Sequence, residues 1–130
     1  MIVVDASAVI ELLLNTADGD AIADRLFDPA ESLAAPHLLD VEVLQVLRRY
    51  SIAGEIDSKR GQQAIEDLGD LPITRYPHDL FLCRIWDLRQ NITAYDAVYV
   101  ALAEALGANL LTRDERLAAA PGHKATIETI

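Results

Sequence analysis

The sequence predicts an α/β fold, a three-layer α/β/α sandwich with a mostly parallel central sheet. Three observations predict it. Short apolar runs alternate along the chain with stretches of helical pattern, as in folds built from strand–helix units. The apolar runs show no alternation of polar and apolar residues, which indicates strands covered on both faces. No internal repeat and no linker rich in Gly, Ser or Pro divides the chain, so residues 1–130 are expected to form a single domain.

Five short runs, most of them apolar, are expected to be strands. In chain order they are Ile2–Val4, Leu33–Ala35, Ile73–Tyr76, Asn109–Thr112 and Ala125–Ile130. Seven stretches with helical patterns lie between them: Ala8–Leu14, Ala21–Phe27, His37–Ile52, Ser58–Gly69, Leu80–Leu88, Ala94–Leu106 and Glu115–Ala119. Pro36 suits the first turn of the third helix, Ser58 is expected to cap the fourth, and Gly107 ends the sixth.

The composition indicates a packed domain that stays in a reducing compartment. Hydrophobic residues make up 52% of the 130 residues and charged residues 25%, which excludes a disordered chain. Cys83 is the single cysteine, so neither an intramolecular disulfide nor a zinc site with several thiolates can form. Asp5 and Glu11 interrupt the N-terminal apolar stretch, and no Lys or Arg precedes Arg25. We therefore expect neither a signal peptide nor a membrane span, and a cytoplasmic location.

The charge limits the partners. Eleven Lys and Arg face 21 Asp and Glu, which gives a net charge of −10. A protein that held nucleic acid by its overall field would have the opposite sign. Any action on nucleic acid must therefore depend on a local site, with basic patches or a bound cation. The acidic excess favours metal ions and basic peptides as partners.

Two aspartates stand at the ends of predicted strands. Asp5 directly follows the first strand, and Asp114 follows the strand Asn109–Thr112. Each precedes a helix, and Asp is a preferred N-cap, so capping explains either residue alone. Ligand sites of parallel α/β sheets lie at the carboxyl ends of strands, and two such aspartates favour a site there.

Glu42 lies inside a predicted helix, so it is not a cap. Gln45 and Arg49 continue the same stripe of the helix beside an apolar face, which indicates one wall of a polar cleft. A solvated residue at the margin of the apolar stripe is the alternative. Asp40 falls on the other side of the helix and is expected to be solvated.

Asp96 lies in the first turn of an otherwise apolar helix, where Thr93 and Asp96 resemble a capping box. Both a capping and a ligand role are open for it. If these four acids converge, they cannot all stay ionised unaided, because two like charges 4 Å apart repel by about 4 kcal/mol at an effective dielectric of 20. Protonation or a divalent cation must relieve the repulsion. Oxygen ligands suit Mg²⁺ or Mn²⁺, one ion or two, and such sites hydrolyse phosphate esters.

Four segments together resemble a known family: Ile2–Ala8, Asp40–Arg49, Tyr95–Tyr99 and Leu111–Leu117. They resemble the PIN-domain family of nucleases, and the match is close to the VapC toxins of bacterial toxin–antitoxin pairs. The resemblance spans essentially the whole chain in the right order. It implies a single PIN-like domain that acts as a magnesium-dependent endoribonuclease and toxin.

The resemblance also implies roles for the acidic residues. Asp5, Asp96 and Asp114 would bind the metal, Asp114 directly or through water, and Glu42 would orient the attacking water. Asp5, Glu42, Asp96 and Asp114 are thus the expected catalytic residues. Gln45 departs from the family, where many relatives carry Asn, and its longer arm changes the contact with the acidic site.

Substrate contacts are expected from Ser7, Thr112, Arg49 and Arg113, which lie next to the acidic motifs. Helix capping explains the two hydroxyl residues equally well, and solvated arginines are as common as phosphate contacts. Arg48 and Arg116 also lie next to the acidic motifs and are further candidates for contacts with RNA phosphates. The RNA itself is expected to be structured and cut at one or a few places.

Other residues are expected to have no role in catalysis. Trp86, Tyr95 and Tyr99 sit in apolar helical patterns and are expected in the core. The histidines lack metal-ligand spacing. Two other functions compete: a non-catalytic PIN-like scaffold that binds RNA or a partner, and an aspartyl-phosphate protein of the receiver or phosphatase type. A phosphatase pattern, however, needs an Asp where Ser7 stands.

The resemblance implies protein partners. A cognate VapB-like antitoxin is expected to silence the site by inserting an Arg among the carboxylates. Its tail is expected on apolar surface near Ile10–Leu14 and Ala21–Leu26. The family also forms homodimers, so a homodimer is expected, with no attachment to a membrane.

Overall fold

The computed structural model describes residues 1–130, which form five strands and seven α-helices. The strands are β1 (Ile2–Val4), β2 (Leu33–Pro36), β3 (Ile73–Tyr76), β4 (Asn109–Thr112) and β5 (Ile127–Thr129). The helices are α1 (Ala6–Leu13), α2 (Gly19–Leu26), α3 (Leu38–Ile52), α4 (Ser58–Asp70), α5 (Leu82–Asp87), α6 (Ala94–Leu106) and α7 (Glu115–Ala119). A short 3-10 turn, η1 (Asp79–Phe81), precedes α5. None of the helices has the length and apolar character that a bilayer crossing needs.

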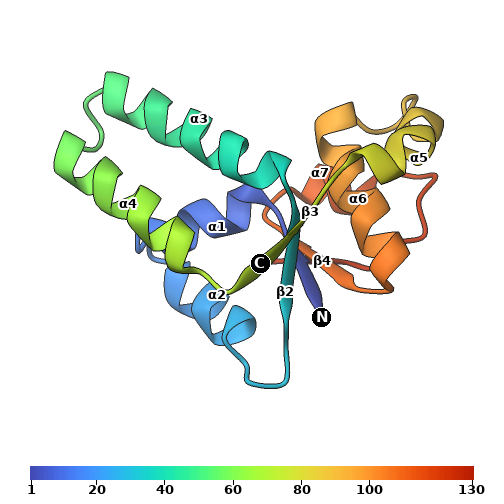
Figure 1. Ribbon diagram of the computed structural model, residues 1–130, viewed down its shortest axis with the longest axis horizontal. Helices are drawn as coiled ribbons and strands as arrows, with labels where there is room; N and C mark the ends of the chain where they lie inside the picture. Colours follow the sequence, from blue (N-terminus) through green and yellow to red (C-terminus); the bar gives the residue numbers. More distant parts are fainter.

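The sheet confirms the predicted fold class. Its strand order is β3-β2-β1-β4-β5, and every neighbouring pair is parallel. Helices α1 to α4 lie on one side of the sheet and α5 to α7 on the other, so the three layers are plain (Figure 1). From β1 the chain adds β2 and β3 outward on one side, then returns to add β4 and β5 on the other. The order therefore reverses between β1 and β4, the place where α/β sheets bind ligands.

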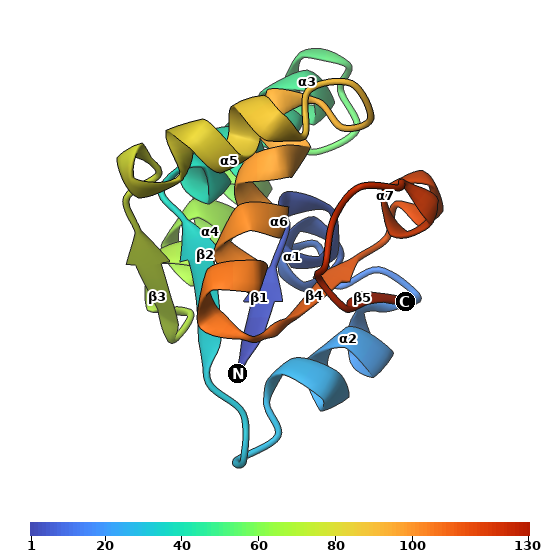
Figure 2. The same ribbon diagram turned by 90° about the vertical axis from the view of Figure 1, so that its right-hand side faces the viewer.

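The core explains why the apolar runs do not alternate. All three residues of β1 are fully buried, because helices cover both faces of this central strand. Helix α6 lies directly against β1, β2 and β4 (Figure 2), and every residue from Ala97 to Ala103 is buried. Gly107 ends that helix in the left-handed conformation with φ of 60°, as predicted.

Several local predictions were wrong at element boundaries. Pro36 closes β2 instead of opening the next helix, and its strand partner is Tyr76. Asp57, not Ser58, caps α4, because its carboxylate accepts the Arg60 N–H at 2.7 Å. The stretch Leu80–Leu88 divides into η1 and α5.

Two aromatic residues predicted in the core are on the surface. Trp86 is 66% exposed and Tyr95 is 65% exposed, whereas Tyr99 is buried as expected. Asp40 is not simply solvated: the Arg75 guanidinium pairs with its carboxylate at 2.8 Å. This ion pair joins the start of α3 to β3.

Candidate functional site: a cavity lined by four carboxylates

The four acids singled out from the sequence line one cavity. Asp5, Glu42, Asp96 and Asp114 surround a space of about 140 Å³. Ala6, Ser7 and Tyr99 complete its lining. Asp5 directly follows β1, and Asp114 stands two residues beyond the neighbouring β4, while Glu42 comes from α3 and Asp96 from α6. The cavity therefore lies at the carboxyl ends of the central strands, where the strand order reverses.

Asp5 is the most firmly held of the four. Its Oδ1 accepts hydrogen bonds from the backbone N–H groups of Ser7 (3.0 Å) and Ala8 (3.3 Å) and from the Ser7 hydroxyl (2.5 Å). Its Oδ2 accepts a bond from the Thr112 hydroxyl at 2.5 Å. Asp5 thus caps α1 and lines the cavity at once, so both interpretations of this residue hold.

The two hydroxyls on Asp5 are themselves fixed. The Ser7 oxygen accepts the Arg113 N–H, and the Thr112 oxygen accepts the Asp114 N–H, both at 3.0 Å. Each hydroxyl therefore donates its single proton to Asp5 and is oriented by a backbone donor. Thr112 is fully buried, so its hydroxyl holds Asp5 and has no open surface for the predicted substrate contact, whereas Ser7 holds Asp5 and also lines the cavity.

Glu42 has a buried partner that the sequence did not reveal. The Tyr99 hydroxyl donates a hydrogen bond of 2.6 Å to Glu42 Oε1 and so ties α6 to α3. Tyr99 is otherwise enclosed in the core, where a phenol hydroxyl needs a partner. Its spacing of three residues from Asp96, on the same face of α6, was the signal that could have identified it.

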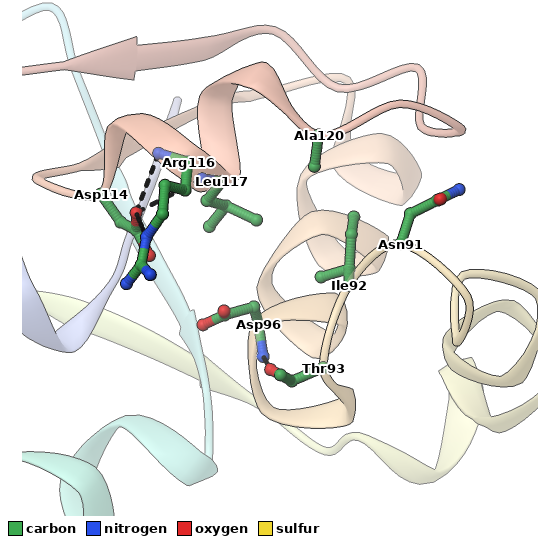
Figure 3. Close-up of a pocket in the computed structure, with 8 residues that line it drawn as sticks. All are labelled: Asn91, Ile92, Thr93, Asp96, Asp114, Arg116, Leu117 and Ala120. Carbon is green, nitrogen blue, oxygen red and sulfur yellow. Dashed lines mark hydrogen bonds and ion pairs between the residues drawn. The ribbon is translucent and has the colours of Figure 1, made fainter.

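Asp96 and Asp114 face each other across the opening of the cavity. The Asp96 carboxylate points toward Asp114 and Arg116 (Figure 3). The Asp96 N–H donates to Thr93 Oγ1 at 3.2 Å, so Thr93 caps α6 as the sequence predicts. Asp114 Oδ1 accepts the Arg116 N–H at 2.9 Å and the Leu117 N–H at 3.4 Å, and so caps α7.

The electrostatics of the cavity disfavour ionised carboxylates. Burial raises the pKa of Asp5, Glu42 and Asp96 above their ordinary values. Repulsion from neighbouring carboxylates raises the pKa of Glu42 and Asp96 further. Hydrogen bonds from Ser7 and Thr112 oppose the rise in the pKa of Asp5. The only ion pair with one of the four acids is the exposed contact of 3.7 Å between Arg116 and Asp114.

The donors fit a divalent cation by chemistry. Four carboxylates supply oxygen ligands alone, the kind that Mg²⁺ and Mn²⁺ prefer, and no cationic side chain lines the cavity. As the side chains stand, no three His, Cys, Asp or Glu lie close enough together to hold a metal ion. Binding an ion therefore requires some of these carboxylates to turn inward.

The arginines near the site differ in what they contact. Arg113, predicted to bind substrate, pairs with Asp18 at 2.9 Å and with Glu11 at 3.7 Å. Arg49 makes no ion pair and lines a groove beside Glu42. Arg116, 96% exposed, stands at the rim next to Asp114. Arg49 is therefore free to meet a phosphate, Arg116 is held only by its exposed contact of 3.7 Å with Asp114, and Arg113 pairs with Asp18 and Glu11.

Two grooves share lining residues with the cavity. One of about 310 Å³ shares Asp96 and Asp114 with it and is the pocket in Figure 3. The other, of about 490 Å³, shares Ala6 and Glu42 with it. Gln45 lines this second groove and not the acidic cavity. Each groove therefore borders two of the residues that line the acidic cavity.

Comparisons with known proteins agree with this architecture. The model of the PIN domain matches residues 2–122. Ribonuclease VapC9 of Mycobacterium tuberculosis is 47% identical over 117 residues, which cover 90% of this chain and 88% of that protein.

Two solved structures resemble the whole fold. PAE2754 from Pyrobaculum aerophilum has a TM-score of 0.70 at 28% identity and covers 97% of this chain and 81% of its own. VapBC2 from Rickettsia felis, bound to a DNA fragment from its promoter, has a TM-score of 0.71 at 14% identity. The match covers 99% of this chain and 98% of that chain.

Proposed function

The chain belongs to the PIN-domain family, and from this premise we propose that it is a metal-dependent endoribonuclease, the toxin of a toxin–antitoxin pair. The observation that carries the proposal is the meeting of Asp5, Glu42, Asp96 and Asp114 in one cavity at the reversal of strand order. A relative of nearly half identical sequence is named a ribonuclease, which supports the same activity. We also propose a cytosolic location, because the substrate is RNA and a single unpaired cysteine suits a reducing compartment.

Asp5, Asp96 and Asp114 would hold Mg²⁺, or Mn²⁺ in its place. When bound, such an ion supplies a water of lowered pKa and stabilises charge that develops on the phosphate. Asp5 is suited to an anchoring role because Ser7 and Thr112 fix both of its oxygens. Asp96 and Asp114 face the open side of the cavity and are suited to close on an ion.

Glu42 would orient the attacking water and accept its proton. The raised pKa of Glu42 makes it a better proton acceptor than an ordinary carboxylate, since the best general bases have a pKa near the working pH. The Tyr99 hydroxyl holds Glu42 Oε1 and leaves Oε2 for the water. Tyr99 touches no substrate in this scheme and is a positioning residue.

Arg49 and Arg116 would contact phosphates on either side of the cut, because each lines one of the two grooves. A net charge of −10 opposes general coating of RNA, so these local contacts and the shape of the RNA must provide the affinity. We therefore propose a structured RNA cut at one or a few places.

The geometry argues against the aspartyl-phosphate alternative. A receiver-type protein needs a lysine near the aspartate that is phosphorylated, and none lines the cavity. A phosphatase of this type needs an Asp where Ser7 stands. A non-catalytic scaffold would not need four acids in one cavity, because clustered carboxylates repel one another and a scaffold would gain nothing from that repulsion.

The partner is proposed to be a VapB-like antitoxin that inserts an Arg among the carboxylates. Its tail is proposed near α1 and α2, where Ile10, Leu13, Ile22 and Leu26 are buried in the core and offer it no surface. The exposed apolar side chains available to it include Phe27, directly after α2, and Leu44, Ile52 and Ile65 on α3 and α4. A separate apolar patch on η1 and α5, made by Leu80, Leu82 and Trp86, supports a homodimer.

Cleavage assays test the activity. The purified chain should cut RNA at a few places in Mg²⁺ and not in EDTA. Uniform degradation of all RNA, or cleavage unaffected by EDTA, would contradict the proposal. Expression of the chain alone should arrest growth, while Asp96→Asn should be harmless. A harmless wild-type chain would end the toxin interpretation even if the fold is right.

A further inference from the structure

The groove of about 490 Å³ beside the acidic cavity has room for a ligand of its own. This volume lies within the roughly 300–1,000 Å³ of sites that bind small molecules. Because Glu42 and Ala6 line both spaces, the groove opens next to the point of cleavage. A group held there would be the immediate neighbour of the scissile phosphate.

Tyr95 is the unusual residue in this groove. It lies in the first turn of α6 next to Asp96, and it is 65% exposed. Its hydroxyl makes no hydrogen bond within the chain, unlike the hydroxyl of Tyr99 one turn further along. The ring is thus a large flat apolar surface that nothing in the fold covers.

The rest of the lining defines the chemistry of the ligand. Leu38, Val41 and Val46 supply apolar walls, and Gln45 supplies an amide with donors and an acceptor. Arg49 adds a guanidinium without an ion pair, although the chain has 21 acidic residues that could neutralise it. This lining is complementary to a nucleotide, which has a flat ring, a polar base edge and a negatively charged phosphate.

We propose that this groove is a nucleobase subsite in which Tyr95 stacks on one unpaired base of the RNA next to the scissile bond. Gln45 would contact the edge of that base, and Arg49 the phosphate that follows it. The subsite rests on the proposed function, which identifies RNA as the ligand. A base can reach the ring only from a single-stranded loop or bulge, so the cut falls in an unpaired segment of a structured RNA.

The groove suits RNA better than it suits a second copy of the chain. Its unpaired cation and its opening into the acidic cavity match an anionic strand that must reach the carboxylates. The apolar patch of Leu80, Leu82 and Trp86 contributes no residue to the groove, although Leu82 and Tyr95 line a neighbouring apolar pocket together. The oligomeric state of each variant must therefore be measured together with its RNA binding.

The test measures binding, in EDTA, of a fluorescein-labelled oligoadenylate and of an abasic oligoribonucleotide of the same length. Fluorescence anisotropy compares the wild type with Tyr95→Ala, Tyr95→Phe and the control Phe27→Ala, a ring 48% exposed that lies outside the groove. Tyr95→Ala should weaken oligoadenylate binding roughly five- to hundredfold, the size of one lost stacking contact, and leave abasic binding unchanged. Tyr95→Phe and Phe27→Ala should bind both probes like the wild type.

Three results would overturn the subsite. Tyr95→Ala that binds both probes like the wild type shows that no base stacks there. An equal loss for both probes shows that Tyr95 contacts the backbone and not a base. A shift of Tyr95→Ala from dimer to monomer in size-exclusion chromatography shows that a second copy covers the ring. Base-dependent binding through Tyr95 without any cleavage in Mg²⁺ would instead refute the nuclease activity and leave the subsite standing.

Discussion

Helix α6 carries two carboxylates that the fold treats in opposite ways. Asp96 lies in its first turn, where the helix dipole favours negative charge, and Glu104 lies in its last turn, where the dipole opposes it. Yet the pKa of Asp96 is raised, by burial and then by repulsion from Asp114 and Asp5. The pKa of Glu104 is lowered, because the Arg84 guanidinium binds it with two hydrogen bonds of 2.9 Å. Burial and neighbouring charges, and not position on the helix, therefore decide whether the pKa of each carboxyl rises or falls.

The same contrast holds across the molecule. Cations neutralise acids away from the cavity: the N-terminal amine and then Arg25 lower the pKa of Glu31, and Arg25 lowers the pKa of Glu128. Inside the cavity no cation plays this part. The fold thus places its few cations where they stabilise the structure and leaves one cluster of carboxylates unbalanced. That imbalance is what a divalent ion would relieve.

The largest effect that this contrast predicts is on activity. Asp96→Asn or Asp5→Asn should lower RNA cleavage by at least about a hundredfold, comparable to removing one preorganised electrostatic group from an active site. Glu42→Gln should be similarly inactive. The matched control is Glu104→Gln, which removes a charge from the other end of α6 and should cut RNA like the wild type. Equal losses in Asp96→Asn and Glu104→Gln would mean that α6 matters only for stability.

Tyr99→Phe should have the next largest effect. It removes the hydroxyl that holds Glu42 but keeps the ring in the core, so kcat should fall about tenfold while KM stays unchanged, the size expected for a lost hydrogen bond to a charged group. Tyr50→Phe on α3 is the control, because no hydrogen bond within the chain involves its hydroxyl. A Tyr99→Phe protein with full kcat would remove Tyr99 from the site.

Arg49, which makes no ion pair, and Arg113, which pairs with Asp18 and Glu11, are expected to have different roles. Arg49→Ala should lower kcat/KM about two- to fivefold, the worth of one exposed charge contact, without changing the melting temperature. Arg113→Ala should keep its activity but lose up to about 1 kcal/mol of stability, since it releases Asp18 and Glu11. Cleavage kinetics and thermal melts of both variants check this pair. Full activity of Arg49→Ala together with reduced activity of Arg113→Ala would mean that Arg113, and not Arg49, contacts the RNA.

The two ends of α6 should also respond oppositely to pH. The folded pKa of Asp96 is above its unfolded value, so the free energy of unfolding falls as pH rises through that window. The folded pKa of Glu104 is below its unfolded value, so its contribution is present above the unfolded pKa and is lost on acidification. At neutral pH without metal, Asp96→Asn should therefore be more stable than the wild type, and Glu104→Gln less stable by about 0.2–1 kcal/mol.

Denaturant unfolding at neutral pH and below pH 4 measures both differences. Both should shrink at the acid end, where the carboxylates are protonated in the folded and the unfolded chain. Asp96 suits this test better than Asp5, whose oxygens accept four hydrogen bonds that Asn would disturb. A destabilised Asp96→Asn at neutral pH would contradict the picture of an unbalanced cavity.

The sequence predicted the strands, the apolar helix α6 and the four acids because each has a local signal. Ile2–Val4 is a bare apolar run, Gly107 stops a helix, and an acid after a strand points to the ligand-binding edge. Contacts over long separations had no such signal. Ser7 and Thr112 meet on Asp5 from segments more than a hundred residues apart, and no local pattern distinguishes that from capping.

Helical periodicity also misjudged the aromatic residues. It shows which face of a helix is apolar but not where along its length the helix meets the sheet. Tyr95 stands one turn before Tyr99, beyond the edge of the core, and is therefore exposed although it belongs to an apolar pattern. The ion pairs of Arg113 could not be predicted for a similar reason, since its partners Asp18 and Glu11 are distant in sequence.

The most direct test of the central claim is a thermal melt of the purified chain with increasing Mg²⁺ or Mn²⁺, alongside Asp96→Asn. If the four carboxylates form a metal centre, a metal at roughly 100 times its Kd should stabilise the wild type by about 2.7 kcal/mol. The variant should gain far less over the same range. A wild-type melting temperature that saturating metal leaves unmoved, or an equal rise in the variant, would contradict the claim that this cavity binds the ion.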